Sequence, residues 1–137
     1  MREHEDEMST LVLVVDDNVL NVKVFEGLLR VHGYEVITAF DGREALSKID
    51  QYAPDLVLLD VMMPELNGYD VCVRIRQNPA TAGLPVIMVT ALDKVTDRQT
   101  GMAVGADEFL TKPVEMDKLL LAIRKLVQHR RPVARAS

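Results

Sequence analysis

The chain has 137 residues, the length of one domain, and its 48% hydrophobic and 27% charged residues are ordinary for a globular protein. A formal net charge of -5 argues against a nucleic-acid surface, and no apolar stretch is long enough to cross a bilayer. The single cysteine, Cys72, excludes an internal disulfide and is interpreted as a small buried residue of a helix. We therefore expect a cytoplasmic protein without membrane contact.

Strands and helices alternate along the chain, between an acidic segment, residues 1–10, and a basic tail, residues 130–137. We expect both ends to be flexible. Short β-branched, apolar runs predict strands, and helical spacing of apolar residues predicts helices. The expected strands are Leu11–Val15, Glu35–Ala39, Leu56–Asp60, Pro85–Val89 and Glu108–Leu110. The expected helices are Val19–Val31, Arg43–Ile49, Gly68–Gln77, Val95–Val104 and Met116–Gln128.

This alternation predicts a single α/β domain, residues 11–129, with a parallel sheet covered by helices on both faces. Asp41 stands before Glu44 at capping-box spacing, at the start of the second helix. Gly33 and Gly105 follow helices, where a left-handed C-cap is expected. The basic tail is interpreted as a solvated terminus, with a nucleic-acid contact as the alternative.

Acidic residues follow two of the most apolar strands. Asp16 and Asp17 come directly after Leu11–Val15, and Asp60 ends Leu56–Asp60. If these strands are parallel neighbours, the carboxylates meet at the carboxyl edge of the sheet, where open α/β sheets bind ligands. Such a cluster favours a cation, and oxygen ligands alone indicate Mg²⁺. Two ordinary readings stay open, because Asp17 can cap the following helix and Asp60 can be structural.

The remaining strand ends add a hydroxyl and an ammonium group. Thr90 directly follows the fourth expected strand. Lys112 lies shortly after the fifth, directly before Pro113. Taken singly, a strand-end threonine and a Lys-Pro turn are unremarkable. Carboxylates, a hydroxyl and an ammonium at one edge of a sheet together fit phosphoryl transfer, which depends on positioning and charge neutralisation.

The combined pattern resembles the receiver domain of two-component response regulators over about residues 11–128. The motifs that carry this resemblance are Asp16-Asp17, Asp60-Val-Met-Met-Pro64 with Gly68, Thr90-Ala91 and Val104-Gly-Ala-Asp-Glu-Phe-Leu-Thr-Lys-Pro113. The segments Ala91–Arg98 and Asp16–Asn21 are similar to receivers of PleD-type diguanylate cyclases and of hybrid kinases. The resemblance implies a flavodoxin-like, doubly wound, five-stranded sheet in the order 2-1-3-4-5.

The resemblance also implies roles for the site residues. Asp60 would be the phosphoacceptor, loaded by a histidine kinase or a histidine phosphotransfer protein. Asp17, Asp60 and the main-chain carbonyl of Met62 would bind Mg²⁺ directly, and Asp16 would act through a metal-bound water. Lys112 would pair with a phosphoryl oxygen. These roles are physically reasonable, because a carboxylate attacks a polyanionic donor poorly unless cations screen the repulsion.

Thr90 and Phe109 would form the switch. In the family pattern the Thr90 hydroxyl moves toward the phosphoryl group, and Phe109 turns inward into the space that it leaves. A permanently buried Phe109 is the alternative. The Lys112–Pro113 bond would be cis, which aims the lysine into the site. The apolar Met62 and Leu92 would flank the phosphoryl group and position water poorly, which predicts a long-lived phosphoryl-aspartate.

Other functions fit less well. An aspartyl-phosphate phosphatase places a second aspartate two positions after the nucleophile, but Met62 stands there and cannot donate a proton. We expect a signalling domain and not a turnover enzyme, acting on a downstream protein effector as a monomer or a weak, phosphorylation-dependent dimer. A stand-alone regulator is favoured. The input receiver of a larger regulator, such as a diguanylate cyclase, and a phosphorylation-independent interaction module stay open.

Overall fold

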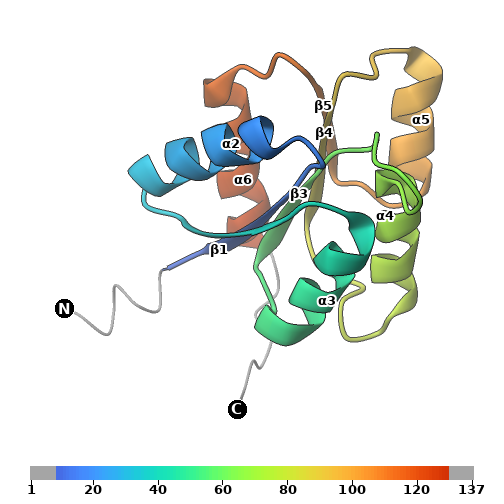
Figure 1. Cartoon of the computed structure of the whole chain (residues 1–137), viewed down its shortest axis with the longest axis horizontal. Coiled ribbons are helices and arrows are strands. Elements are labelled where there is room, and N and C mark those ends of the chain that lie inside the picture. The colour runs from blue at the N-terminus through green and yellow to red at the C-terminus, as the bar shows by residue number, and fades with distance from the viewer. Residues whose placement is uncertain (1–8, 130–137) are drawn as a thin grey trace.

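The computed structural model describes residues 9–129, so residues 1–8 and 130–137, which hold most of the expected acidic extension and basic tail, lie outside the described residues. The described chain forms one parallel sheet flanked by helices (Figure 1). The strands are β1 (Leu11–Val15), β2 (Glu35–Ala39), β3 (Leu56–Leu59), β4 (Val86–Thr90) and β5 (Glu108–Thr111). The helices are α2 (Val19–Val31), α3 (Gly42–Tyr52), α4 (Gly68–Gln77), α5 (Val95–Ala103) and α6 (Met116–His129).

The sheet has five strands in the order β2-β1-β3-β4-β5, and all neighbouring strands pair in parallel. The predicted fold class is therefore confirmed. The element boundaries shift slightly from those expected. β3 ends at Leu59, so Asp60 is the first residue beyond the strand, while β4 extends to include Thr90. Both residues consequently lie at the carboxyl edge of the sheet.

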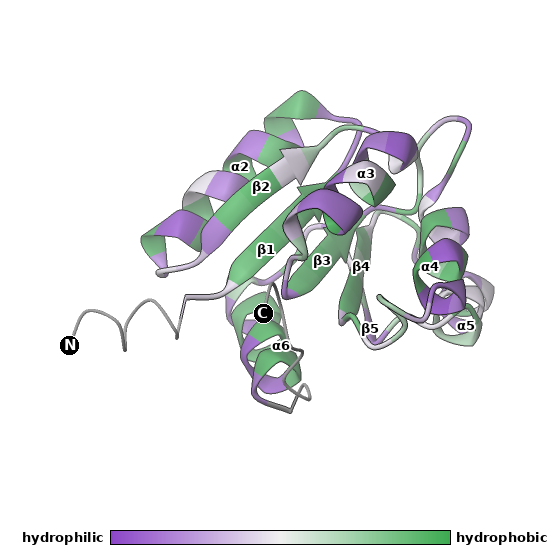
Figure 2. Ribbon diagram, turned by 90° about the horizontal axis from the view of Figure 1, so that it is seen from below, coloured by the Kyte–Doolittle hydropathy of each residue, from purple (hydrophilic) through white to green (hydrophobic). Residues whose placement is uncertain are grey.

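Two apolar layers hold the helices on the sheet, because alternate residues of each strand face opposite sides. Along β1, Val12 and Val14 contact the layer under α2 and α6. Leu13 and Val15 belong to the opposite layer, which packs against α3 and α4. Figure 2 shows the apolar strands between helices whose outward turns are hydrophilic. The three central strands β1, β3 and β4 are buried on both faces, which explains why their sequences are almost continuously apolar.

The helix caps confirm part of the sequence analysis. The Asp41 carboxylate accepts the Glu44 N–H at 2.7 Å, as expected. The predicted capping box is wrong in its other half, because the Glu44 carboxylate reaches past Asp41 and accepts the Phe40 N–H at 2.8 Å. Gly33 and Gly105 adopt φ values of +91° and +113°, the left-handed conformations predicted after the first and fourth helices.

The helices α5 and α6 differ in what they bury. α6 presents Leu119 and Ile123, both fully buried, to the sheet. The only buried residue of α5 is Gly101, and its apolar Val95 is 71% exposed. In the described part of the chain, no helix combines the length and apolar character that crossing a membrane requires.

Cys72 of α4 is fully buried, as the sequence predicted. Its thiol donates to the carbonyl of Val104, the C-cap residue of α5, at 3.4 Å. Burial raises the pKa of the Cys72 thiol, which the nearby Arg76 partly offsets. The thiol therefore serves as a packed, unreactive contact between the two helices.

Candidate functional site

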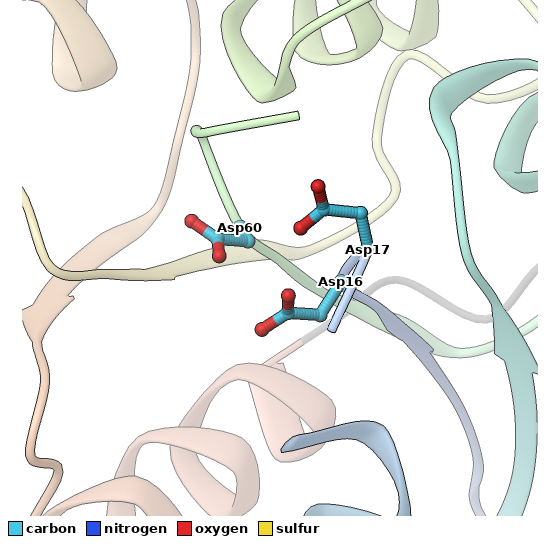
Figure 3. Close-up of side chains that lie close together, drawn as sticks. All are labelled: Asp16, Asp17 and Asp60. Atoms are coloured by element: carbon cyan, nitrogen blue, oxygen red, sulfur yellow. The ribbon is translucent and has the colours of Figure 1, made fainter. Parts of the chain in front are cut away.

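Three carboxylates meet at the carboxyl edge of the sheet (Figure 3). Asp16 and Asp17 follow β1 and Asp60 follows β3, and the two strands are neighbours whose last residues pair. The Asp60 N–H continues this pairing by donating to the Val15 carbonyl at 3.0 Å. One oxygen of each carboxylate lies within 4.8 Å of one on each of the others. The parallel register therefore creates the predicted acidic cluster, with Asp16 and Asp60 buried and Asp17 exposed.

Asp16 is fixed by hydrogen bonds to both of its oxygens. Oδ1 accepts the Asn18 N–H at 2.9 Å, while Oδ2 accepts the Asn21 side-chain amide at 3.3 Å and the Lys112 ammonium at 2.7 Å. Asp17 does not cap α2, because Asn18 is the N-cap and accepts the Asn21 N–H. The helix-capping reading of Asp17 is therefore wrong. Sequence reasoning gave Asn21 no role, although its segment resembled the family pattern.

Lys112 reaches the cluster from the far edge strand. Its Nζ lies 2.7 Å from Asp16 Oδ2 and 3.1 Å from Asp60 Oδ2. Burial lowers the pKa of Lys112, but the hydrogen bond to Asp16 and the charge of Asp60 outweigh it, so the pKa is raised. Lys112 is thus charged throughout the neutral range. The peptide bond between Lys112 and Pro113 is cis, as the resemblance implied.

The loop after Asp60 is packed tightly against the acceptor. Asp60 Oδ1 accepts the Met62 N–H at 3.1 Å, which orients the carboxylate. A side chain at Gly68 would collide with the Asp60 carbonyl, so only glycine lets α4 begin this close to the strand end. The Met62 side chain is 54% exposed, whereas Asp60 itself is buried.

Thr90 and Phe109, the expected switch pair, are both buried. The Thr90 hydroxyl accepts the Leu92 N–H at 3.4 Å. The Phe109 ring packs against Gly101 of α5, where an added Cβ would lie 2.7 Å from Phe109 Cδ2. The ring is thus already inside the fold in this structure. An inward turn on phosphorylation stays a prediction, and the alternative of a permanently buried aromatic stays open.

The donor set of the cluster fits a hard divalent cation. Three carboxylates and one ammonium, that of Lys112, leave a formal charge of -2. Every candidate ligand atom is an oxygen, and exposed Asp17 provides access from solvent. Asp16 and Asp60 each accept hydrogen bonds on both carboxylate oxygens, so the exposed Asp17 is the most accessible of the three carboxylates to a cation.

The comparisons with known proteins identify this arrangement. The family model of the response regulator receiver domain matches residues 12–124. The chain belongs to this family. The receiver is 44% identical over 121 residues to the response regulator PleD of Caulobacter vibrioides, covering 88% of this chain and 27% of PleD. It is 42% identical to the protein PilG of Pseudomonas aeruginosa, covering 89% of this chain and 90% of PilG.

Solved structures agree with the family. The chemotaxis protein CheY4 of Vibrio cholerae matches with a TM-score of 0.81 at 34% identity, covering 86% of this chain and 98% of CheY4. The receiver domain of the Francisella response regulator 1452 matches with a TM-score of 0.83 at 31% identity, covering 90% and 100% of the two chains. By contrast, the chain spans about half or less of several curated relatives, including 48% of the probable transcriptional regulator ycf27 of Guillardia theta.

Proposed function

We propose that this receiver accepts a phosphoryl group on Asp60 from the phosphohistidine of a histidine kinase or a phosphotransfer protein, with Mg²⁺ as cofactor. A carboxylate oxygen of Asp60 attacks phosphorus, the phosphorus–nitrogen bond breaks, and the imidazole keeps the electron pair and takes up a proton. The observation that carries the proposal is the contact of buried Asp60 with Lys112 at 3.1 Å, beside two further carboxylates. No second substrate is turned over, so the domain acts as a signalling acceptor.

Different site residues would neutralise the negative charge of the incoming phosphoryl group in different ways. Asp17, Asp60 and the Met62 carbonyl would hold Mg²⁺, and Asp16 would contact it through water. The cation, when bound, screens the repulsion between the carboxylate and the incoming phosphoryl group. Lys112 already touches Asp60, so it needs to move little to pair with a phosphoryl oxygen. Asp16 keeps the Asn21 amide and the Asn18 N–H when Lys112 leaves it.

The switch is proposed to run from Thr90 to Phe109. A phosphoryl group on Asp60 draws the Thr90 hydroxyl away from the Leu92 N–H, a long contact of 3.4 Å that is easily given up. The Phe109 ring then repacks between Thr90 and Gly101. Because Phe109 and Gly101 are in contact, this repacking changes the position of α5 and so the surface that a partner reads.

The phosphoryl group is proposed to persist, because both side chains expected beside it are apolar. Met62 and Leu92 have no polar atom that orients an attacking water through a strong hydrogen bond. Replacing them as Met62→Asn and Leu92→Glu supplies such groups. We expect the double variant to lose its label faster than the parent, followed by intact mass after the phosphodonor is removed. Equal lifetimes would contradict this part of the proposal.

The phosphohistidine donor is proposed to dock over α2. This helix starts beside the acidic cluster and exposes Leu20, Val24 and Leu28, which are spaced four residues apart and 69%, 50% and 37% exposed. We propose that a protein whose histidine reaches Asp60 covers this neighbouring surface. Leu20→Ser should slow loading by the protein donor and leave loading by acetyl phosphate unchanged. Val95→Ser, at an equally exposed position on α5, is the control.

A stand-alone regulator that acts on a downstream protein is favoured, in line with the match to 90% of PilG. The input receiver of a longer protein is the alternative, in line with the match to 27% of PleD. As a stand-alone protein it would act as a monomer or as a dimer that phosphorylation stabilises. We place it in the cytoplasm, where a reducing environment keeps the single thiol free.

The deciding experiment is intact mass after incubation with acetyl phosphate and Mg²⁺. We expect the parent to gain one phosphoryl group, and the Asp60→Asn protein and a parent sample without Mg²⁺ to gain none. Lys112→Met tests the charge pairing and should load more slowly. A parent that stays unlabelled under conditions that label another receiver would overturn the proposal, and the interaction module that needs no phosphorylation would replace it.

A further inference from the structure

Tyr69 connects α4 to α5 between the loops that follow Asp60 and Thr90. It is the second residue of α4, and its ring packs partly buried against the apolar layer on that face. Its hydroxyl donates to the main-chain carbonyl of Asp97, in the first turn of α5, at 3.0 Å. Burial, followed by the charge of Asp97, raises the pKa of Tyr69, so the hydroxyl keeps its proton and remains a donor.

The α4 end of this contact is fixed to the acceptor. The Gly68 N–H donates to the Val61 carbonyl at 2.9 Å, and the Gly68 backbone is packed directly on the Asp60 carbonyl. Tyr69 is the next residue along the chain. Any displacement of the backbone at Asp60 or Val61 therefore acts on the backbone that carries the Tyr69 side chain.

The α5 end of the contact is fixed to the loop that follows Thr90. The Asp97 carboxylate accepts the Lys94 N–H at 3.1 Å, which closes the first turn of α5. Residues 91–94 alone connect that turn to Thr90. Elsewhere α5 has few attachments to the sheet: Gly101 is its one buried residue, and Arg98 donates to the Phe109 carbonyl at 2.9 Å.

We propose that Tyr69 is a positioning residue that couples the loop after Asp60, here called the acceptor loop, to α5. The hydrogen bond from its hydroxyl fixes the position of the first turn of α5 relative to the acceptor loop. A change at Asp60 then reaches α5 by a second route, which does not pass through Thr90 and Phe109. This inference rests on the proposed function, because phosphorylation of Asp60 is the change that the hydroxyl transmits.

The Tyr69→Phe protein tests the coupling, since it removes one oxygen and keeps the ring packing. Tyr52→Phe, at a 47% exposed position at the end of α3, is the matched control. Hydrogen exchange of the α5 amides is measured before and after loading with acetyl phosphate and Mg²⁺, and intact mass gives the loaded fraction. Exchange in α6, which neither substitution touches, serves as the internal reference.

We expect Tyr69→Phe to load to the same extent as the parent, because its hydroxyl does not touch Asp60. Its α5 amides should exchange about fivefold faster before loading, the effect of losing one neutral hydrogen bond. The change in α5 exchange on loading should be reduced in Tyr69→Phe and kept in Tyr52→Phe. Faster exchange with the full loading response would show a structural contact only and would overturn the inference.

The proposed function fails in a different way. A parent that gains no phosphoryl mass would overturn the proposed function and the coupling together. If the parent loads and the α5 amides of Tyr69→Phe respond to loading as those of the parent do, the coupling alone is overturned.

Discussion

Helices α5 and α6 lie on opposite faces of the sheet beside the same edge strand, β5, but are held there by different forces (Figure 1). α6 is attached by the fully buried side chains of Leu119 and Ile123. α5 buries one glycine and relies on hydrogen bonds from Tyr69 and Arg98. Apolar burial has no preferred direction and persists through small movements, whereas a single hydrogen bond is lost by a movement of about 1 Å.

This difference indicates that α6 contributes to the stability of the fold and that α5 responds to changes in the site. The site residues Thr90 and Lys112 stand at the ends of β4 and β5, between the two helices. A structural change at these residues acts on a tightly packed apolar layer on the α6 face of the sheet. On the α5 face it acts on a helix with few attachments. We therefore expect α5 to move first, and the following substitutions test that expectation.

The largest effect is expected from Leu119→Ala in α6. Removing a fully buried side chain from a packed layer should lower the free energy of unfolding by about 2–5 kcal/mol, measured by urea denaturation. Leu121→Ala, on the same helix at a 53% exposed position, is the control and should change stability by about 0.5 kcal/mol or less. Similar losses at both positions would show that burial does not hold α6.

A smaller effect is expected from Gly101→Ala in α5. The new methyl group would lie 2.7 Å from Phe109 Cδ2 and 3.1 Å from Met88 Sδ, so the ring or the helix has to shift. The strain should outweigh the gain in helix propensity and lower the free energy of unfolding by about 1 kcal/mol.

The matched substitution is Gly27→Ala in α2, where a Cβ meets nothing within 4 Å. This change should raise the free energy of unfolding by up to about 1 kcal/mol, from helix propensity alone. A gain in stability at both glycines would mean that Gly101 does not set the distance between α5 and Phe109.

The smallest effect is expected from the charge at the end of β5. The folded-state pKa of Lys112 is raised above its usual value of 10.5, so the charged lysine stabilises the fold, fully so at lower pH. That stabilisation is lost as the pH rises through the folded-state pKa. The parent should lose unfolding free energy above about pH 10.5 more steeply than Lys112→Met, measured by denaturation at several pH values. Parallel pH profiles would contradict the assignment.

The fold and most of the site could be predicted from sequence because they depend on periodicity and on strand ends. Asp16, Asp17, Asp60, Thr90 and Lys112 could be placed together once the strands were taken as parallel, since parallel strands end at one edge. That inference needs no knowledge of side-chain packing. The cluster of three aspartates therefore follows once β1 and β3 are neighbours, and the order of the sheet was implied by the resemblance to the receiver family.

The parts that could not be predicted depend on how helices pack. The hydrogen bond from Tyr69 to Asp97 joins residues 28 positions apart on two helices, and no sequence period relates them. The Glu44 carboxylate accepts the N–H of Phe40 and not that of Asp41, a choice of partner that the capping pattern does not specify. The packing of Phe109 depends on the absence of a side chain at Gly101, which the position of Gly101 in the sequence does not indicate.

The buried thiol of Cys72 has a practical consequence for the pair formed by α4 and α5. The thiol is shielded and its pKa is raised, so an alkylating reagent at neutral pH reacts with it only while the two helices are apart. The chain has no other cysteine, so every modified molecule reports one such event. The rate of alkylation thus measures how often the pair opens, before and after loading. The unaltered protein contains its own reporter of this opening, and no label has to be introduced.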